Sequence, residues 1–290
     1  MKFLWALAIS FLITGCTEKD ATQNPEKVRP LPSQSKITVV DRIKGIEAEL
    51  KKADKNTFVV FDCDDVLTTI SSHVWMRSNK AIFLELYKKE FPNFSHEQLL
   101  RHLSLIVASH DNILVSKKMP KLVDNLQQRG IKTAVLTAFS TKASKNFPNP
   151  MKWRIDTLKS LGYHFERSFP SLAHCYLRTS NNQLNSEYNQ GIICCSGASK
   201  DDSLKAFLAY ADYRPSKIIF IDDSIENVRS IEAFCRESNI DFVGIEYTES
   251  EKTKNSAAPF PTKRVEFQLK KLRESGKWIS YEDAEKEMAR

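Results

Sequence analysis

The chain places three aspartates directly behind an apolar run in the stretch TFVVFDCDDVLTT, residues 57–69. Charged side chains are rarely buried without partners, so the run predicts a core strand that ends where the charges begin. Asp62 and Asp64 are two residues apart, and side chains at that spacing in an extended segment point the same way. We therefore expect both carboxylates to face one point beyond the end of this strand.

Four further apolar runs have the length of strands and are separated by helical patterns. They are KTAVLT (132–137), GIICCS (191–196), KIIFIDD (217–223) and DFVGIEY (241–247). Short apolar strands that alternate with amphipathic helices predict an α/β fold with a doubly wound parallel sheet. Ligands of such sheets bind outside the carboxyl ends of the strands. The residues predicted at those ends are Asp62, Thr137, Ser196 and Asp222.

The sequence predicts five parts along the chain. They are a signal peptide at 1–15, a flexible tether at 16–36, a core formed by 37–70 and 119–262, a small helical cap at 71–118 and C-terminal helices at 263–290. The cap is inserted after the first core strand, and its segments AIFLELYKKEF and HEQLLRHLSLIV have helical patterns. Residues 163–190 are polar and predict a hairpin or a long loop, and the two C-terminal helices are predicted to be peripheral.

A helix is predicted at the start of the core. Apolar residues recur there at helical spacing from Ile37 onward, at Val40, Ile43, Ile46 and Leu50. The tether before it is polar and contains prolines, which is typical of a flexible segment.

The N-terminus has the features of an export signal. Lys2 precedes an apolar run to Ile13, too short to span a bilayer but typical of a secretory signal peptide. The end of the run, LITGC, resembles the bacterial lipobox, which implies a lipid on Cys16. The alternative is an ordinary signal peptide with a chance cysteine. Thr17 follows the cysteine where the inner-membrane retention signal has aspartate, so the resemblance favours a lipid anchor in the outer membrane of a bacterial cell envelope, with the folded domain in the periplasm.

Charge and cysteine content limit the partners of the chain. The 43 basic and 36 acidic residues give a formal charge of +7 that is scattered along the sequence. Nucleic-acid binding requires a clustered basic surface, so no nucleic-acid partner is expected. No C-x-x-C pair is present, which disfavours a zinc site. An odd number of cysteines remains besides Cys16, so at least one is unpaired or bonds between chains, and the pairing stays open for Cys63, Cys175, Cys194, Cys195 and Cys235.

Paired carboxylates suggest a metal-assisted reaction. Asp222 and Asp223 form a second acidic pair at another predicted strand end. Several carboxylates that meet without a cation repel one another, and a hard cation such as Mg²⁺, which prefers oxygen ligands, resolves that conflict. One carboxylate of such a set can then act as a nucleophile and another as a general acid and base.

Four segments in order resemble the motifs of the haloacid dehalogenase (HAD) superfamily. FDCDDV is similar to motif I, AVLT ending at Thr137 to motif II, Lys200 in SGASKDD to motif III, and IIFIDD to motif IV, over roughly residues 57–227. The resemblance implies that Asp62 is the nucleophile and that Asp64 is the acid and base, with its backbone carbonyl on Mg²⁺. It implies that Thr137 and Lys200 hold and neutralise the phosphoryl group. Asp222 would bind Mg²⁺ directly and Asp223 through water.

This resemblance implies a Mg²⁺-dependent phosphomonoester hydrolase that forms an aspartyl-phosphate and acts on a small phosphorylated substrate. The chain is similar to exported and lipid-anchored bacterial acid phosphatases of the superfamily, and to a HAD family of unassigned function. The alternative is a catalytically silent lipoprotein that binds a phosphorylated ligand or a protein partner. The complete set of motif residues favours an enzyme.

Several positions have competitors. Lys205 lies one turn after Lys200 but inside the predicted helix, where reaching the site is harder. Thr133 and Ser140 compete with Thr137, which alone closes its apolar run. Asn227 either caps the following helix or orients Asp222 or Asp223. We expect Asp65 to hydrogen-bond the backbone of its loop and Cys63 to face away from the aspartates and pack in the core.

Overall fold

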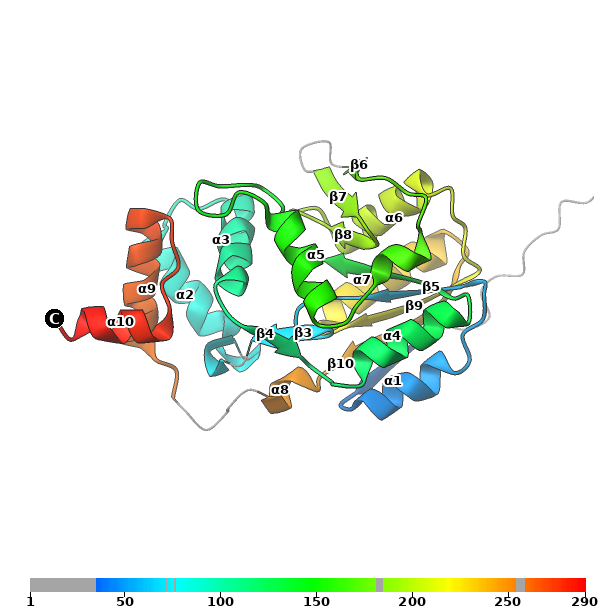
Figure 1. The fold of residues 1–290 in the computed structure, drawn as a ribbon, viewed down its shortest axis with the longest axis horizontal. Helices are drawn as coiled ribbons and strands as arrows, with labels where there is room; N and C mark the ends of the chain where they lie inside the picture. Colours follow the sequence, from blue (N-terminus) through cyan, green and yellow to red (C-terminus); the bar gives the residue numbers. More distant parts are fainter. Residues whose placement is uncertain (1–34, 71, 76, 181–184, 254–258) are drawn as a thin grey trace, which may run out of the picture. The chain divides into compact units, whose positions relative to one another are not determined.

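A computed structural model describes residues 35–290 except 71, 76, 181–184 and 254–258, so the predicted signal peptide, Cys16 and most of the tether lie outside the described residues. In the described part, eight strands form one sheet in the order β1-β10-β9-β2-β5-β8-β7-β6 (Figure 1). Their bounds are Ser35–Val40 (β1), Asp241–Tyr247 (β10), Lys217–Asp222 (β9), Thr57–Phe61 (β2), Lys132–Thr137 (β5), Ile192–Cys194 (β8), Asn185–Asn189 (β7) and Cys175–Arg178 (β6). Pairing is parallel from β1 to β8 and antiparallel from β8 to β6. The prediction of an α/β fold with a mostly parallel sheet is confirmed.

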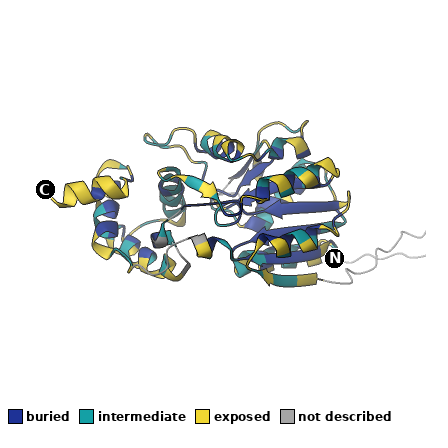
Figure 2. Ribbon diagram, turned by 60° about the horizontal axis from the view of Figure 1, so that its bottom comes forward, coloured by how far each residue is buried: buried dark blue, intermediate teal, exposed yellow. Residues whose placement is uncertain are grey.

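Helices cover both faces of the sheet, because alternate residues of each strand point to opposite faces. Val59 and Phe61 of β2 pack on the side of α1 (Ile43–Leu50), α4 (Met119–Gln128) and α5 (Pro150–Ser160). Phe58 and Val60 pack on the side of α6 (Lys200–Tyr210) and α7 (Ile225–Glu237). The strands are accordingly the most buried part of the ribbon (Figure 2). The sheet is thus wound on both faces, as predicted.

The strand order reverses direction beside β2. From β2 the chain moves outward to β5 and β8, then returns to β9 on the other side of β2. In such sheets a crevice opens at the carboxyl ends of the strands where the order reverses, and ligands bind there. Asp62 directly follows β2, and its amide donates to the carbonyl of Ile221 in β9 at 2.8 Å. The predicted functional edge therefore coincides with the reversal point of the topology.

The predicted helix from Ile37 is wrong at its start. Residues 35–40 form β1, an edge strand parallel to β10, and the helix α1 begins only at Ile43. The segment ITVV is a run of β-branched residues, which favour strands, and Ile37 and Val40 pack on opposite faces of the sheet. The strand at residues 57–61 is consequently the second along the chain. Residues 35 and 36, predicted as the end of the tether, belong to β1.

Residues 163–190 contain an antiparallel hairpin, the first of the two predicted alternatives. After the short 3₁₀ helix η3 (Phe165–Ser168), β6 and β7 pair from Cys175↔Tyr188 to Arg178↔Asn185. The hairpin extends the sheet beyond β8 at the edge opposite β1.

The predicted cap contains the two helices α2 (Lys80–Glu90) and α3 (His96–Ala108). The chain leaves and re-enters the core through a two-stranded antiparallel stem, β3 (Thr68–Ile70) and β4 (Asn112–Leu114). The short 3₁₀ helices η1 (His73–Trp75) and η2 (Arg77–Asn79) join the stem to α2.

The C-terminal helix α9 (Thr262–Ser275) belongs to the cap, which corrects the prediction that it is peripheral. It follows the short helix α8 (Ser250–Thr253), and α10 (Tyr281–Met288) follows it. Figure 1 shows α9 beside α2 and α3. The apolar cluster that they share, which we call the cap cluster, consists of Val74, Phe83, Tyr87, Phe91, Ile106, Val265, Leu269, Leu272 and Trp278. The buried residues of α9 recur at the spacing of one helix face, so this helix uses its apolar stripe to complete the cap.

Replacing Leu269 by alanine should destabilise the cap by about 2–4 kcal/mol, since the side chain is fully buried in the cap cluster. The ring centroids of Trp75 and Trp278 lie 6.3 Å apart at this cluster. Tryptophan fluorescence during urea unfolding therefore reports the loss of this packing. Lys270→Ala is the matched control, because the neighbouring Lys270 side chain is 58% exposed. Equal midpoints for Leu269→Ala and the wild type would show that α9 contributes nothing to the cap.

Candidate functional site

The chain forms a tight loop after β2, and Asp64 and Asp65 lie in this loop. The carbonyl of Cys63 accepts from the amides of Leu67 and Thr68 at 2.9 and 3.0 Å. Asp65 has a φ of 66°, in the left-handed region that aspartate tolerates better than most residues. Its carboxylate accepts from the Thr69 hydroxyl at 2.7 Å. The observed donor to this carboxylate is the side chain of Thr69 in β3, whereas the expected partner of Asp65 was the backbone of its loop.

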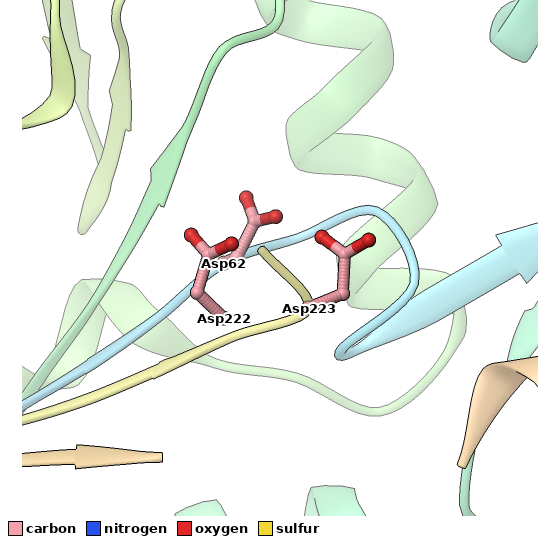
Figure 3. Close-up of side chains that lie close together, drawn as sticks. All are labelled: Asp62, Asp222 and Asp223. Carbon is pink, nitrogen blue, oxygen red and sulfur yellow. The ribbon is translucent and has the colours of Figure 1, made fainter. Parts of the chain in front are cut away.

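Three carboxylates converge at the carboxyl ends of β2 and β9. One oxygen each from Asp62, Asp222 and Asp223 lies within 4.8 Å of the others (Figure 3). All three residues are buried. Asp62 comes from the end of β2, Asp222 is the last residue of β9, and Asp223 follows it. Asp62 of the first acidic pair therefore meets both aspartates of the second pair, whereas Asp64 is not part of this cluster.

Lys200 lies between two of these carboxylates. Its Nζ atom is 2.7 Å from Oδ1 of Asp62 and 2.6 Å from Oδ2 of Asp222. Lys200 is the first residue of α6, where Ser199 caps the helix by accepting from the amide of Asp202. Lys205, the competitor one turn later, is exposed. Placement at the helix start is what brings Lys200 to the sheet edge.

Asp222 is held in one orientation by α7. Its Oδ1 atom accepts from the Ser224 amide at 2.8 Å and from Nδ2 of Asn227 at 3.0 Å. Of the two interpretations of Asn227, the structure therefore shows the orienting one, because this side chain holds the carboxylate.

One lysine does not balance the charge of the cluster. Burial raises the pKa of Asp62 well above its ordinary value, with a further increase from Asp222, Asp223 and Asp64 that opposes the effect of Lys200. Burial and the neighbouring Asp222 and Asp65 likewise raise the pKa of Asp223 to about 6, against the opposing charge of Lys80. Lys200 keeps its proton, since Asp222 and Asp62 outweigh burial and raise its pKa. An all-oxygen donor set with excess negative charge fits a hard divalent cation such as Mg²⁺.

Asp64 has a different partner. Its Oδ1 and Oδ2 atoms accept from Nη1 and Nη2 of Arg154 at 3.0 and 2.9 Å. The side chain of Asp64 is 40% exposed, whereas that of Arg154 is fully buried. Thr137, the last residue of β5, places its hydroxyl 3.5 Å from Oδ2 of Asp64, at the outer limit for a hydrogen bond. The carboxylate of Asp64 thus faces the site from a fixed position, and the predicted contact of its backbone carbonyl with a metal stays a prediction.

A cavity of about 390 Å³ opens above these residues. Its polar lining includes Asp62, Asp64, Thr137, Lys200 and Asp223. Its other wall comes from the stem and the cap and from the loop after β5, with Ile70, Trp75, Leu100, Leu103, Val107 and Phe139. Lys80, the first residue of α2, also lines it and lies 3.4 Å from Asp223. Five of the predicted site residues therefore share one cavity with the cap, and Asp222 lies buried behind its lining.

Comparison with known sequences places the chain in a family. Residues 39–285 match the family described as "Protein of unknown function (DUF2608)". The chain belongs to the DUF2608 family. A protein of Chlamydia pneumoniae named "Putative outer membrane protein" is 25% identical over 234 residues, which cover 76% of this chain and 81% of the relative. A Chlamydia trachomatis protein of the same name is 24% identical over 234 residues, with the same coverage.

A third relative comes from Rickettsia felis and is described as an uncharacterized protein. It is 22% identical over 246 residues, which cover 80% of this chain and 83% of the relative. No solved structure matches the chain significantly. Within the described residues, no helix of this DUF2608 protein combines the length and the apolar character needed to cross a membrane.

The competing residues of this DUF2608 chain lie away from the aspartates. The hydroxyl of Thr133 is 2.9 Å from that of Ser168, and the amide of Ser140 donates to the Ser104 hydroxyl at 2.8 Å. Cys63 is buried in the core and its Sγ atom contacts Nη1 of Arg154 at 3.2 Å, which agrees with a packing role. The cysteines within the described residues are all free thiols, namely Cys63, Cys175, Cys194, Cys195 and Cys235.

Arg154 is a site residue that the sequence reasoning missed. It lies on the buried face of α5 together with Met151, Ile155 and Leu158. Its guanidinium stacks 4.2 Å above the ring of Phe139. An arginine at a core-facing position of an amphipathic helix is a detectable signal, because a buried charge requires a partner.

On the expectation that Asp64 is the acid and base of a phosphomonoester hydrolase, replacing Arg154 by methionine should lower turnover of an alkyl phosphate about ten- to a hundredfold more than turnover of p-nitrophenyl phosphate. An alkoxide leaving group needs a proton from a positioned acid, whereas p-nitrophenolate leaves without one, so misplacing Asp64 penalises the alkyl ester. The measurement is kcat/KM for both esters, because this ratio reports the step in which the leaving group departs, whereas the aspartyl-phosphate that follows is the same for both.

Arg167→Met is the matched control, since Arg167 is half exposed and pairs with Asp124 on the surface. Equal losses for the two esters in Arg154→Met would assign Arg154 a purely structural role.

Proposed function

We propose that this chain is a Mg²⁺-dependent phosphomonoester hydrolase of the HAD type that acts through an aspartyl-phosphate on Asp62. The observation that carries the proposal is the meeting of Asp62, Asp222 and Asp223 around Lys200, at the point where the strand order reverses. Phosphoryl transfer depends mainly on positioning and on charge stabilisation. This arrangement supplies fixed carboxylates, the buried ammonium group of Lys200 and a cavity for the substrate.

The proposed reaction has two steps. A carboxylate oxygen of Asp62 attacks phosphorus, the bond from phosphorus to the ester oxygen breaks, and Asp64 gives its proton to the departing alcohol. Water then attacks the phosphorus of the aspartyl-phosphate, Asp64 takes the proton of that water, and inorganic phosphate leaves with Asp62 restored.

Asp64 is suited to this exchange by its surroundings. Its oxygens each accept one hydrogen bond from Arg154 and retain a second lone pair for the proton. Thr137 and Lys200 would hold the phosphoryl oxygens. Asp62, Asp222 and the backbone carbonyl of Asp64 would hold Mg²⁺, with Asp223 acting through water, and the ion would counter the charge of the phosphoryl oxygens.

The direct test is a panel of phosphomonoesters assayed with Mg²⁺ and with EDTA. We expect phosphate release that requires the cation and labelling of Asp62 in a trapped phosphoenzyme. If no ester of the panel releases phosphate while phosphorylated ligands still bind, the catalytically silent alternative is favoured. Release that is indifferent to EDTA would contradict the cation-dependent mechanism.

We further propose that the chain is exported and lipid-anchored, with its folded domain on the periplasmic side of the outer membrane. The LITGC stretch supports this location, as do the names of the two Chlamydia relatives. Its partners would then be a membrane, through the lipid on Cys16, and a small phosphorylated substrate.

Cys16→Ser should prevent incorporation of labelled palmitate and lipoprotein-type cleavage, because the acylated side chain is absent. Two or more acyl chains anchor a protein stably, whereas one is marginal, so the variant should also move to the soluble fraction. Cys235→Ser is a matched control that should label like the wild type, since Cys235 is buried in the fold. A wild-type chain without label that begins elsewhere than residue 16 would contradict the anchor and leave the enzyme proposal standing.

A further inference from the structure

The cavity at the candidate site has two chemically different walls. The wall formed by the strand ends carries charged and hydroxyl groups, namely Asp62, Asp64, Asp223, Lys200 and Thr137. The facing wall is mainly apolar, with Ile70, Trp75, Leu100, Leu103, Val107 and Phe139, and it also carries Lys80, Ser104 and Asn112. A phosphate held at the first wall would therefore point the rest of its ester toward apolar surface.

The apolar stripe of helix α3 continues from the cap cluster into that wall. Ile106 is buried in the cap cluster, and Leu99 packs against it. Leu103 packs against the cap cluster and also lines the cavity. Leu100 and Val107 line the cavity and are only half buried. Apolar surface left in water forgoes about 25 cal/mol per Å², so this end of the stripe offers apolar surface that a ligand would cover.

A polar residue of this wall is already engaged. The hydroxyl of Ser104 donates to the Leu100 carbonyl at 2.9 Å and accepts from the Ser140 amide at 2.8 Å. These bonds tie α3 to the loop that follows β5, so the apolar wall stands at a fixed position relative to Thr137.

The charges in the cavity disfavour a second anionic group on the ligand. Among the described residues that line it, the basic ones are Lys80 and Lys200. Lys200 contacts Asp62 and Asp222, and Lys80 pairs with Asp223. Among the side chains that the structure describes, a carboxylate or a second phosphate would meet these pairs and the charge of Asp64 and Asp65.

We propose that the ligand is the phosphomonoester of a small, uncharged, apolar alcohol, alkyl or aryl, in preference to a sugar phosphate or a nucleotide. This rests on the proposed function for the identity of the phosphate end. The apolar wall takes the alcohol part and Asp62 faces the phosphorus. The cavity of about 390 Å³ lies at the small end of ligand sites, which suits a short chain or a single ring.

The first measurement is binding, because it does not depend on turnover. Ethylphosphonate, butylphosphonate, hexylphosphonate and 2,3-dihydroxypropylphosphonate are titrated calorimetrically into the full folded domain with Mg²⁺. A buried methylene should tighten binding about three- to fourfold, so hexylphosphonate should bind at least about tenfold tighter than ethylphosphonate. The dihydroxypropyl compound should bind more weakly than the butyl compound.

The second measurement uses a variant of the wall. Val107→Thr keeps the shape of the side chain and replaces a methyl group by a hydroxyl group, so the hexyl-to-ethyl affinity ratio should fall about threefold or more. Val39→Thr makes the same change at an exposed position on β1 and should leave the ratio unchanged. A ratio of two affinities is insensitive to the fraction of protein that is folded.

The outcomes separate this inference from the proposed function. Chain-length-dependent binding without phosphate release from the matching alkyl phosphates supports the ligand class and overturns the hydrolase. Phosphate release with equal affinity for ethyl and hexyl compounds, or with preference for the dihydroxypropyl compound, overturns the ligand class and leaves the hydrolase standing. Absence of both binding and release overturns both.

Discussion

Replacing Asp62 by asparagine should abolish turnover, with a loss of at least about a thousandfold in kcat. The amide has nearly the shape of the carboxylate but lacks its charge and its nucleophilic oxygen, and loss of a covalent nucleophile costs several orders of magnitude. The measurement is hydrolysis of p-nitrophenyl phosphate together with trapping of the phosphoenzyme. Activity near that of the wild type would exclude the covalent mechanism.

A loss of activity in Asp62→Asn must be separated from a loss of folding. Burial and the nearby carboxylates raise the pKa of Asp62 despite Lys200. A raised carboxyl pKa means that ionisation destabilises the folded state, a penalty that is absent below the ordinary value and grows as the pH rises above it. In EDTA at neutral pH the variant, which cannot ionise, should therefore melt no lower than the wild type. A markedly lower melting temperature would contradict this account of the site.

Replacing Asp222 by asparagine should remove the response of the protein to Mg²⁺. Asp222 is fully buried and fixed by Asn227 and the Ser224 amide, so a neutral amide there weakens the cation site without room for another ligand. We expect a loss of at least about a hundredfold in Mg²⁺-dependent phosphate release. EDTA should abolish the activity of the wild type, and added Mg²⁺ should restore it.

Thermal denaturation gives a readout of the cation that is independent of catalysis. A cation present at a hundred times its dissociation constant stabilises the folded state by about 2.7 kcal/mol. Mg²⁺ should thus raise the melting temperature of the wild type and of the control Asp156→Asn, whose carboxylate is exposed beside Lys152. The same shift in Asp222→Asn would show that Asp222 is not a ligand.

The parts of the fold that could be predicted are those that local patterns determine. Apolar runs of strand length gave the central strands, and the charged residues at their ends gave the carboxylates that the structure brings together at one edge. The first strand was predicted as part of a helix because Ile37 and Val40 are three residues apart. That spacing places two residues on one face of a helix, but on opposite faces of a strand. Four residues are too few to separate the two periods without the neighbouring β10.

The parts that could not be predicted depend on contacts between distant segments. The apolar stripe of α9 is visible in the sequence, but nothing local indicates that α2 covers it. Arg154 and Lys80 reach Asp64 and Asp223 only because the chain folds α5 and the cap against the sheet edge. In a site formed by several distant segments, the residues at strand ends can be predicted from the sequence. Residues that other segments contribute can be identified only from the structure.

The joining of α2 and α9 has a consequence for how the chain acquires its structure during the proposed export. The pair Lys89 and Glu266 spans 177 residues, and every described strand of the sheet precedes α9, so a chain that crosses the membrane from its N-terminus delivers α9 last. In that interval α3 can already cover Tyr87 through His102, but the side of α2 that packs on α9 is exposed to association with other chains. Protein that lacks α9 should therefore form the sheet and the carboxylate cluster but aggregate through this side of α2.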